Sequence, residues 1–271
     1  MGTDDPDGFS SDGEGPAREV SISPFYIGET TVTNEQFAKF VDATGYLTEA
    51  DRYDWSFVFH LFVPPEVAKT VTQAVADAPW WWQVKGSNWR NPEGQGSDIQ
   101  DRMDHPAVHI AWTDAIAYCE WAGNRLSTEA EWEMAARGGL DGQTYAWGDD
   151  LTPDGTHKCN IWQGKFPDVN TSEDGFVGTA PVTAFEQNGF GLYNVAGNVW
   201  EWQSDWFSPN YHKASQSKNP TGPRSGSSRS IRGGSYLCHE SYCNRYRVAA
   251  RSSNTPDSST GNLGFRCVMD A

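Results

Sequence analysis

Two cysteines with a histidine and a tyrosine between them stand in "GGSYLCHESYC", residues 233–243. Cys238 and Cys243 are five positions apart, which places them about 140° apart on a helix and on opposite faces of a strand. Their sulfur atoms can therefore meet only if the segment bends, and the two glycines at its start favour a bend. A bent segment would allow a local disulfide, an exchangeable dithiol or a site for a soft metal ion.

Soft metal ions restrict the third possibility. Thiolates select Cu(I), Zn(II) or the iron of iron–sulfur clusters. Zinc ordinarily takes four ligands, and no second Cys or His pair stands at zinc-finger spacing. Two thiolates satisfy a low-coordinate Cu(I) ion and leave room for a further ligand. The residue types alone nevertheless favour a structural role, either a local disulfide or two separate buried thiols.

Three arginines follow this segment, at Arg245, Arg247 and Arg251. Positive charge near a thiol lowers the pKa of that thiol and makes it more reactive. The commoner use of such arginines is a salt bridge to an acidic residue, and both uses remain open at this point.

Oxygen-rich loops form a second candidate. Residues 160–176, "NIWQGKFPDVNTSEDGF", and residues 194–202, "NVAGNVWEW", combine carboxylate and amide side chains with glycine. Calcium binds hard oxygen ligands, including main-chain carbonyls, on such irregular loops. The same residue types are also ordinary turn formers, and no EF-hand pattern is present. A third candidate is residues 78–89, "APWWWQVKGSNW", whose four tryptophans could line a peptide or sugar groove or pack in the core.

Composition limits the function classes. The chain has 271 residues and a formal net charge of −16, which argues against a nucleic-acid or anionic-membrane partner. It contains 13 Trp, 10 Tyr and 13 Phe beside 27 Gly and 15 Pro, which predicts aromatic packing between many turns. No apolar run is long enough for a membrane span, and no basic-then-apolar leader opens the sequence.

Regular elements should be few. Thr33 with Gln36 forms a capping-box pattern before a helix over 34–45, and Thr128 with Glu131 forms another before a helix over 129–139. We also expect a helix over 65–78, a helix capped by Thr113, and one or two strands within 20–33. Residues 1–18 are an acidic tail or covering loop. Without a linker or an internal repeat, the prediction is one loop-rich α+β domain over 1–271.

Residues 232–267, "RGGSYLCHESYCNRYRVAARSSNTPDSSTGNLGFRC", resemble the signature of the formylglycine-generating enzymes, the sulfatase-modifying factor family. "RLSTEAEWEMAARGG", "NIWQGKFPDVNTSEDGF", "GLYNVAGNVWEW" and "DHPAVHIAW" are also similar to that family, so the resemblance extends from Met1 to Cys267. The cysteine pair is its specific part, because relatives of other function share the remaining scaffold. Family members usually have a strand before this start, which would lie upstream of Met1.

The resemblance implies a fold and an activity. The fold would be the formylglycine-generating-enzyme fold, which is related to C-type lectin-like domains and low in regular secondary structure. The activity would be a copper-dependent oxidation, by O2 and a reductant, of the cysteine in a Cys-x-Pro-x-Arg motif of an unfolded sulfatase polypeptide. The product would be Cα-formylglycine. We further expect a cytoplasmic monomer, with no nucleic-acid or membrane partner.

The resemblance also implies site residues. Cys238 and Cys243 would bind Cu(I), and Ser235, Tyr242 and His239 would supply the catalytic polar groups beside them. Trp80 and Trp200 would contact the substrate. The carboxylate that the family places near residue 55 is out of register, since Trp55 stands there and Asp54 comes one place earlier.

Two calcium sites and a further cysteine pair are implied in the same way. The first calcium site would take Asn160, Ile161, Asp174 and Phe176. The second would take Asn194, Gly197, Val199 and Glu201. Cys119 and Cys267 match a disulfide of secreted relatives, whereas Val248 stands where those relatives need a cysteine for a second bridge. Bridge loss suits a reducing cytosol, so the Cys119–Cys267 pairing stays open.

Two other classes of function compete with the oxidase. One is a non-catalytic lectin-like binding or activator module, in which the cysteine pair is only structural. The other is an iron-dependent sulfoxide synthase, which would need a cluster of histidines that the sequence does not contain.

Overall fold

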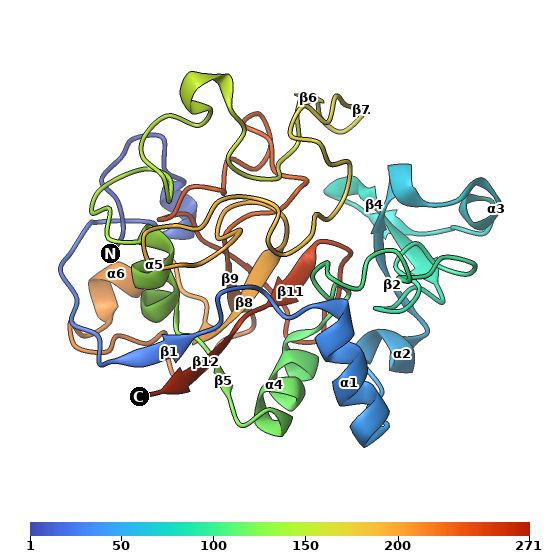
Figure 1. Cartoon of the computed structure of the whole chain (residues 1–271), viewed down its shortest axis with the longest axis horizontal. Coiled ribbons are helices and arrows are strands. Elements are labelled where there is room, and N and C mark those ends of the chain that lie inside the picture. The colour runs from blue at the N-terminus through green and yellow to red at the C-terminus, as the bar shows by residue number, and fades with distance from the viewer.

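A four-stranded sheet leads into the cysteine segment. The computed structural model describes all residues 1–271, and this sheet has the order β10-β9-β8-β11 (Figure 1). Its strands are β8 (Trp200–Trp206), β9 (Arg229–Arg232), β10 (Ser252–Asn254) and β11 (Leu263–Phe265). β8 and β9 are antiparallel, and β11 runs parallel to β8 with Leu263 opposite Trp200. Since β9 ends at Arg232, the next residue opens the cysteine segment.

The other strands form small sheets. The order β1-β12-β5 joins β1 (Phe25–Ile27), β12 (Cys267–Asp270) and β5 (Arg125–Leu126). The order β2-β4-β3 joins β2 (Trp55–Phe59), β4 (Ala78–Lys85) and β3 (Ala74–Val75). A hairpin joins β6 (Gly164–Lys165) to β7 (Val169–Asn170). In Figure 1 the β2-β4-β3 sheet lies at one end of the molecule, away from both termini.

The helices are short, between four and eleven residues long. They are α1 (Asn34–Thr44), α2 (Glu49–Tyr53), α3 (Pro65–Ala68), α4 (Trp112–Trp121), α5 (Glu129–Arg137) and α6 (Tyr211–Ala214). Single 3₁₀ turns are η1 (Ser10–Asp12), η2 (His60–Phe62) and η3 (Pro153–Gly155). Both predicted capping boxes are confirmed, because Thr33 and Thr128 accept the amide hydrogens of Gln36 and Glu131. No helix has the length and apolar character that crossing a membrane requires.

Two helix predictions were wrong in part. The helix predicted over 65–78 ends at Ala68, and the chain then forms β3 and β4. The β-branched run Thr70–Val71–Thr72 disfavours a helix, and strand pairing opposite Trp82 wins over the helical pattern. Helix α4 starts before Thr113, which therefore is not its cap. Asp114 instead accepts the Ala111 amide hydrogen at 2.9 Å.

Buried ion pairs connect the elements around β9. Arg232, which is fully buried, donates to Glu133 of α5 at 2.6 Å and lies 3.5 Å from Glu129. Arg251 binds both oxygens of Glu129 at 2.6 and 2.7 Å. Charged side chains that are buried away from water need such partners, because leaving a buried charge unpaired costs much free energy. The network therefore fixes the end of β9 where the cysteine segment begins.

Candidate functional site

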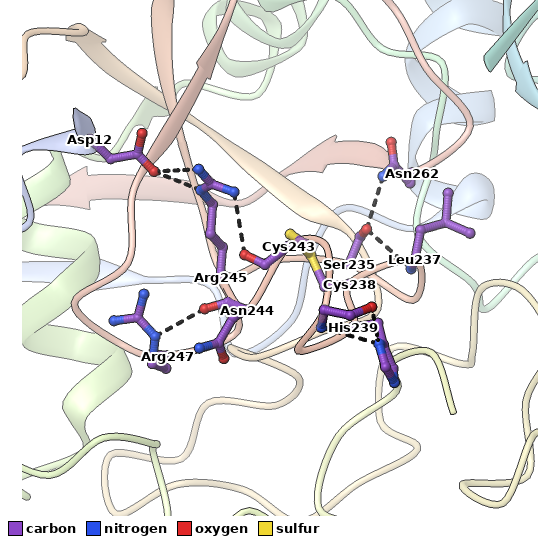
Figure 2. Close-up of a disulfide and its surroundings, with 11 residues drawn as sticks. Asp12, Ser235, Leu237, Cys238, His239, Cys243, Asn244, Arg245, Arg247 and Asn262 are labelled. Carbon is purple, nitrogen blue, oxygen red and sulfur yellow. Dashed lines mark hydrogen bonds and ion pairs between the residues drawn. A yellow bond between two sulfur atoms is a disulfide. The ribbon is translucent and has the colours of Figure 1, made fainter. Parts of the chain in front are cut away.

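The cysteine segment bends sharply at its glycines. Gly233 and Gly234 have φ values of 93° and 73°, which favour glycine. A Cβ on Gly234 would lie 3.0 Å from the Arg245 carbonyl oxygen, so the chain folds back on itself at this point. The amide nitrogens of Cys238 and Cys243 donate to the Ser235 and His239 carbonyls, each at 2.8 Å. These turns bring the two cysteine Cα atoms within 4.8 Å and their sulfurs into a disulfide, so the predicted bend is confirmed (Figure 2).

A cavity of about 200 Å³ opens beside this disulfide. Among its lining residues are six of the seven predicted catalytic and substrate-binding side chains, namely Trp80, Trp200, Ser235, Cys238, Tyr242 and Cys243. His239 does not line it, and its Nδ1 lies 2.8 Å from Ser241 Oγ at the surface. The structure thus brings together two sulfurs, two hydroxyls and two indoles, and leaves the imidazole outside.

Ser235 is held by Asn262, which the sequence analysis missed. The Asn262 amide donates to Ser235 Oγ at 2.9 Å, and the Leu237 amide hydrogen adds a second donor at 3.3 Å (Figure 2). The Thr260 hydroxyl donates to Asn262 Oδ1 at 2.7 Å, which fixes the orientation of that amide. Because Ser235 Oγ already accepts twice, its own hydrogen remains available for a group in the cavity. The only signal for Asn262 is its place directly before a buried strand.

An aromatic wall faces the sulfurs. Tyr242 stacks on Phe166 with ring centroids 4.5 Å apart and meets the edge of Trp80 at 4.8 Å. Burial raises the pKa of the Tyr242 phenol, so the hydroxyl stays protonated and can donate at neutral pH. Phe166 was missed because its ring reaches the site from the β6–β7 hairpin, far away in sequence.

The three arginines have different partners. The Arg245 guanidinium lines the cavity, donates to Asp12 Oδ2 at 2.7 Å and reaches the Cys243 carbonyl oxygen at 3.3 Å (Figure 2). Arg247 pairs with Glu14 at 2.6 Å, and Arg251 pairs with Glu129. All three form salt bridges, and among them only Arg245 lies beside the thiols. Asp12 and Glu14 show that residues 1–18 cover this segment.

The predicted calcium ligands were examined for unpartnered oxygens. In the first set, Asn160 Oδ1 is buried without a hydrogen-bond partner, and the Phe176 carbonyl accepts no hydrogen bond. Asp174 instead accepts from the Ile161 amide and from the Gln163 side chain, at 3.0 and 2.9 Å. Two of four oxygens are therefore free, and Gln163 would have to turn away for the others to be used.

The second set fits an oxygen-seeking cation better. Asn194 Oδ1 is also buried without a partner, and the Gly197 and Val199 carbonyls accept no hydrogen bond. Glu201 is engaged, with Arg266 at 2.8 Å and the Trp132 indole at 2.7 Å. Carboxylate oxygens can accept further bonds, so three free oxygens and a shared carboxylate are compatible with Ca²⁺.

The remaining residues that the sequence analysis singled out do not line this cavity. Cys119 and Cys267 place their sulfurs 3.5 Å apart without a bridge, and Cys159 is a separate buried thiol. Asp54 lies at the end of α2 and pairs with Lys85 at 3.4 Å. Trp55 stacks on Tyr53 with ring centroids 5.9 Å apart.

Known proteins resemble this chain over nearly its whole length. The chain is 60% identical to the formylglycine-generating enzyme of Thermomonospora curvata, over 100% of this chain and 90% of that protein. It is 62% identical to the enzyme of the same name from Streptomyces coelicolor, over 98% and 84%. A protein of Bos taurus named inactive C-alpha-formylglycine-generating enzyme 2 is 47% identical, over 100% and 85%.

The fold has a solved counterpart. PvdO from Pseudomonas aeruginosa superposes with a TM-score of 0.72 at 24% identity, covering 100% of this chain and 90% of that one. Residues 1–271 match the family described as the sulfatase-modifying factor enzyme 1-like domain, and the chain belongs to this family.

Proposed function

We propose that this protein oxidises a cysteine of a sulfatase polypeptide to Cα-formylglycine. The observation that carries the proposal is the Cys238–Cys243 pair beside a cavity with Ser235, Tyr242 and Trp80, in a chain up to 62% identical to proteins named formylglycine-generating enzyme. The substrate would be a Cys-x-Pro-x-Arg segment in an unfolded chain. The net reaction balances as R–CH₂–SH + O₂ + 2 e⁻ + 2 H⁺ → R–CHO + H₂S + H₂O, with the electrons supplied by a reductant.

Copper is the cofactor that suits these donors. Once the disulfide is reduced, Cys238 and Cys243 would present two soft thiolates on turns that already bring their Cα atoms within 4.8 Å. A bound Cu(I) ion would supply the redox chemistry toward O₂ and leave a position for the substrate thiolate. Arg245 places positive charge beside this anionic centre, and Asp12 holds that guanidinium in place.

The other residues of the site act on the substrate and on protons. The Trp80 ring would offer an apolar contact for the substrate peptide next to its reacting cysteine, and Phe166 supports that wall by packing against Trp80 and Tyr242. The hydroxyl hydrogens of Ser235 and Tyr242 can be donated to oxygen atoms in the cavity, because Asn262 occupies the acceptor side of Ser235. Trp200, which is buried, would wall the cavity and limit water at the reacting atoms.

The remaining features of the proposal concern cations, state and compartment. Calcium would tie down the loops that contain Asn160 and Asn194, whose side-chain oxygens have no hydrogen-bond partner and whose backbones share only one isolated β-bridge, Asn160 to Gly197. The protein would act as a monomer. Val248 removes the second bridge of secreted relatives, which suits a reducing compartment, and we propose the cytoplasm.

The test is oxygen consumption with a Cys-x-Pro-x-Arg peptide after reduction and Cu(I) loading, with aldehyde formation followed by mass spectrometry. Cys238→Ser should abolish the aldehyde, whereas Cys159→Ser should retain it, because Cys159 lies outside the cavity. Absence of aldehyde with the wild-type protein, or undiminished aldehyde with Cys238→Ser, would refute the proposal.

A non-catalytic binding module is the second candidate. Two observations favour it, the Cys238–Cys243 disulfide and the relatives at 47–48% identity that are named inactive. A disulfide that persists in excess reductant and prevents copper binding would establish this alternative.

A further inference from the structure

A second cavity lies behind the cysteine site. Its volume is about 310 Å³, and Tyr236 and Gly261 form part of its wall. The flanking residues of the same two segments, Ser235, Leu237, Thr260 and Asn262, line the cysteine cavity instead. Adjacent residues of two segments thus face two separate cavities. The rest of the second wall is largely apolar and includes Val58, Phe59, Phe62, Val108 and Val177.

One buried histidine in this wall has an unusual backbone. His109 is fully buried and has a φ of 57°, a conformation that side-chain-bearing residues seldom adopt. Its amide nitrogen donates to the Thr260 carbonyl at 2.9 Å, and its ring Nδ1 lies 2.8 Å from Ser56 Oγ. A strained residue that its surroundings hold from both backbone and ring is a sign of a functional position.

The other ring nitrogen of His109 has no partner. Nε2 is buried and makes no hydrogen bond in the protein. A Cβ on Gly261 would lie only 3.3 Å from Nε2, so the missing side chain at this position keeps space open in front of the nitrogen. Because His109 and Gly261 both line the cavity, that space belongs to it.

Hydrogen bonds around Ser56 determine which nitrogen carries the proton. The Ser56 hydroxyl donates to the Ser259 carbonyl at 2.8 Å, so its hydrogen is used. Ser259 Oγ also lies 2.7 Å from Ser56 Oγ, and with the Ser56 hydrogen on Ser259, His109 Nδ1 is the donor to Ser56 Oγ and a lone pair is left on Nε2. Burial lowers the pKa of His109 to about 4, and the nearby Glu93 carboxylate and Pro92 carbonyl offset this only in part. The ring is therefore neutral at physiological pH.

No free charge faces the cavity. Glu93 and Arg102, the charged residues in its wall, bind each other through two hydrogen bonds of 2.6 and 3.0 Å. An ion would lose its hydration here without gaining an opposite charge, which is unfavourable. The other polar side chains of the wall are neutral: the Thr179 hydroxyl is bonded to His105, the Tyr236 hydroxyl donates to the Gly261 carbonyl, and His109 Nε2 has no partner.

We propose that this cavity binds a small neutral molecule carrying a hydroxyl group, an alcohol or a phenol, whose hydrogen is donated to His109 Nε2. The apolar body of the ligand would rest against Val58, Phe62 and Val108. The site is independent of the reaction at Cys238 and Cys243, so its test does not depend on the oxidase activity.

Phenol is a suitable probe, and benzene is its matched control without a donor. The measurement is the ¹⁵N resonance of His109 Nε2 during titration of the intact protein. For so small a ligand we expect saturable binding in about the millimolar range, with phenol at least about tenfold tighter than benzene. The Nε2 resonance should move with phenol and stay in place with benzene.

Two variants test the geometry. Gly261→Ala should weaken phenol binding about tenfold, because its Cβ occupies the space before Nε2. His109→Asn keeps a residue type that tolerates positive φ and should remove the preference for phenol over benzene. His157→Asn, outside the cavity wall, should bind phenol as the wild type does.

Three results would overturn the proposal. One is a His109 Nε2 resonance that phenol leaves unmoved, with only water in the cavity of a phenol-soaked crystal. Another is equal affinity for phenol and benzene, which would mean an apolar void. The third is unchanged phenol binding by a folded Gly261→Ala protein.

Discussion

Removing the charge of Glu133 should cost this protein about 3 kcal/mol of unfolding free energy at pH 7. Glu133 is buried in α5, where it accepts from Arg232 at 2.6 Å, from Arg137 at 2.8 Å and from the Gly2 amide at 2.7 Å. Burial opposes its ionisation, but Arg232 and Arg137 outweigh burial and lower its pKa from 4.5 to about 2. A depressed carboxylate pKa stabilises the fold above pH 4.5 and loses that effect as the pH falls towards 2.

The assay is urea unfolding of Glu133→Gln and wild type across pH 7 to 3, with Glu35→Gln as control. Glu35 makes an exposed pair with Lys39 at 2.9 Å, so its change should cost at most about 0.5 kcal/mol. The Glu133→Gln deficit should shrink below pH 4.5, because the unfolded wild type takes up a proton on this carboxyl there, whereas the folded protein, with a pKa of about 2, does not. A deficit under about 1 kcal/mol at pH 7, or one that does not shrink in acid, would refute this reasoning.

Three further changes address the site. Asp12→Asn should weaken Cu(I) binding severalfold, measured in competition with a colorimetric chelator, because Arg245 loses a charged anchor. The control is Asp270→Asn, which weakens a surface pair with Arg125 and should leave Cu(I) affinity unchanged. Phe166→Ala should raise the KM for the peptide about tenfold with less effect on kcat, since it removes the ring under Tyr242. The control is Phe190→Ala, which removes an exposed ring and should leave both constants unchanged. Excess Ca²⁺ should raise the thermal midpoint of the chelator-treated wild type but raise it less in Asn160→Ala, and equal shifts in both would contradict a role for Asn160 Oδ1.

The sequence predicted those elements that depend on interactions between residues close together in the chain. The capping boxes at Thr33 and Thr128 are confirmed because each consists of hydrogen bonds between a threonine and the residue three positions later, without help from the rest of the fold. The bend at Gly233 is confirmed for the same reason, since it depends on backbone freedom at the glycines themselves. The helix over 65–78 failed where pairing with Trp82 overrode a periodic pattern.

The parts of the site that were missed depend on distant contacts. Phe166 and Asn262 are 76 and 19 residues away from Tyr242 and Cys243 in sequence, and only the fold stacks Phe166 on Tyr242 and places Asn262 in the cavity wall. His239 shows the opposite case. It lies next to Cys238 in sequence, yet the turn that bonds its carbonyl to Cys243 directs its ring towards Ser241. Nearness in sequence identified the thiols, but only three-dimensional packing separates the groups that surround them from those that do not.

The anchoring of the cysteine segment explains how thiols on irregular backbone can serve a demanding site. Arg232 precedes the bend and is held by Glu133, while Arg245 and Arg247 follow it and are held by Asp12 and Glu14. Charge-assisted bonds of this kind are short and directional, so both ends of the segment are fixed to separate parts of the chain. Between those ends, Cys238 and Cys243 are joined by turns rather than by a sheet ladder. The proposed copper site requires the two sulfurs to part on reduction, and this anchoring would keep the backbone on either side in place when they do.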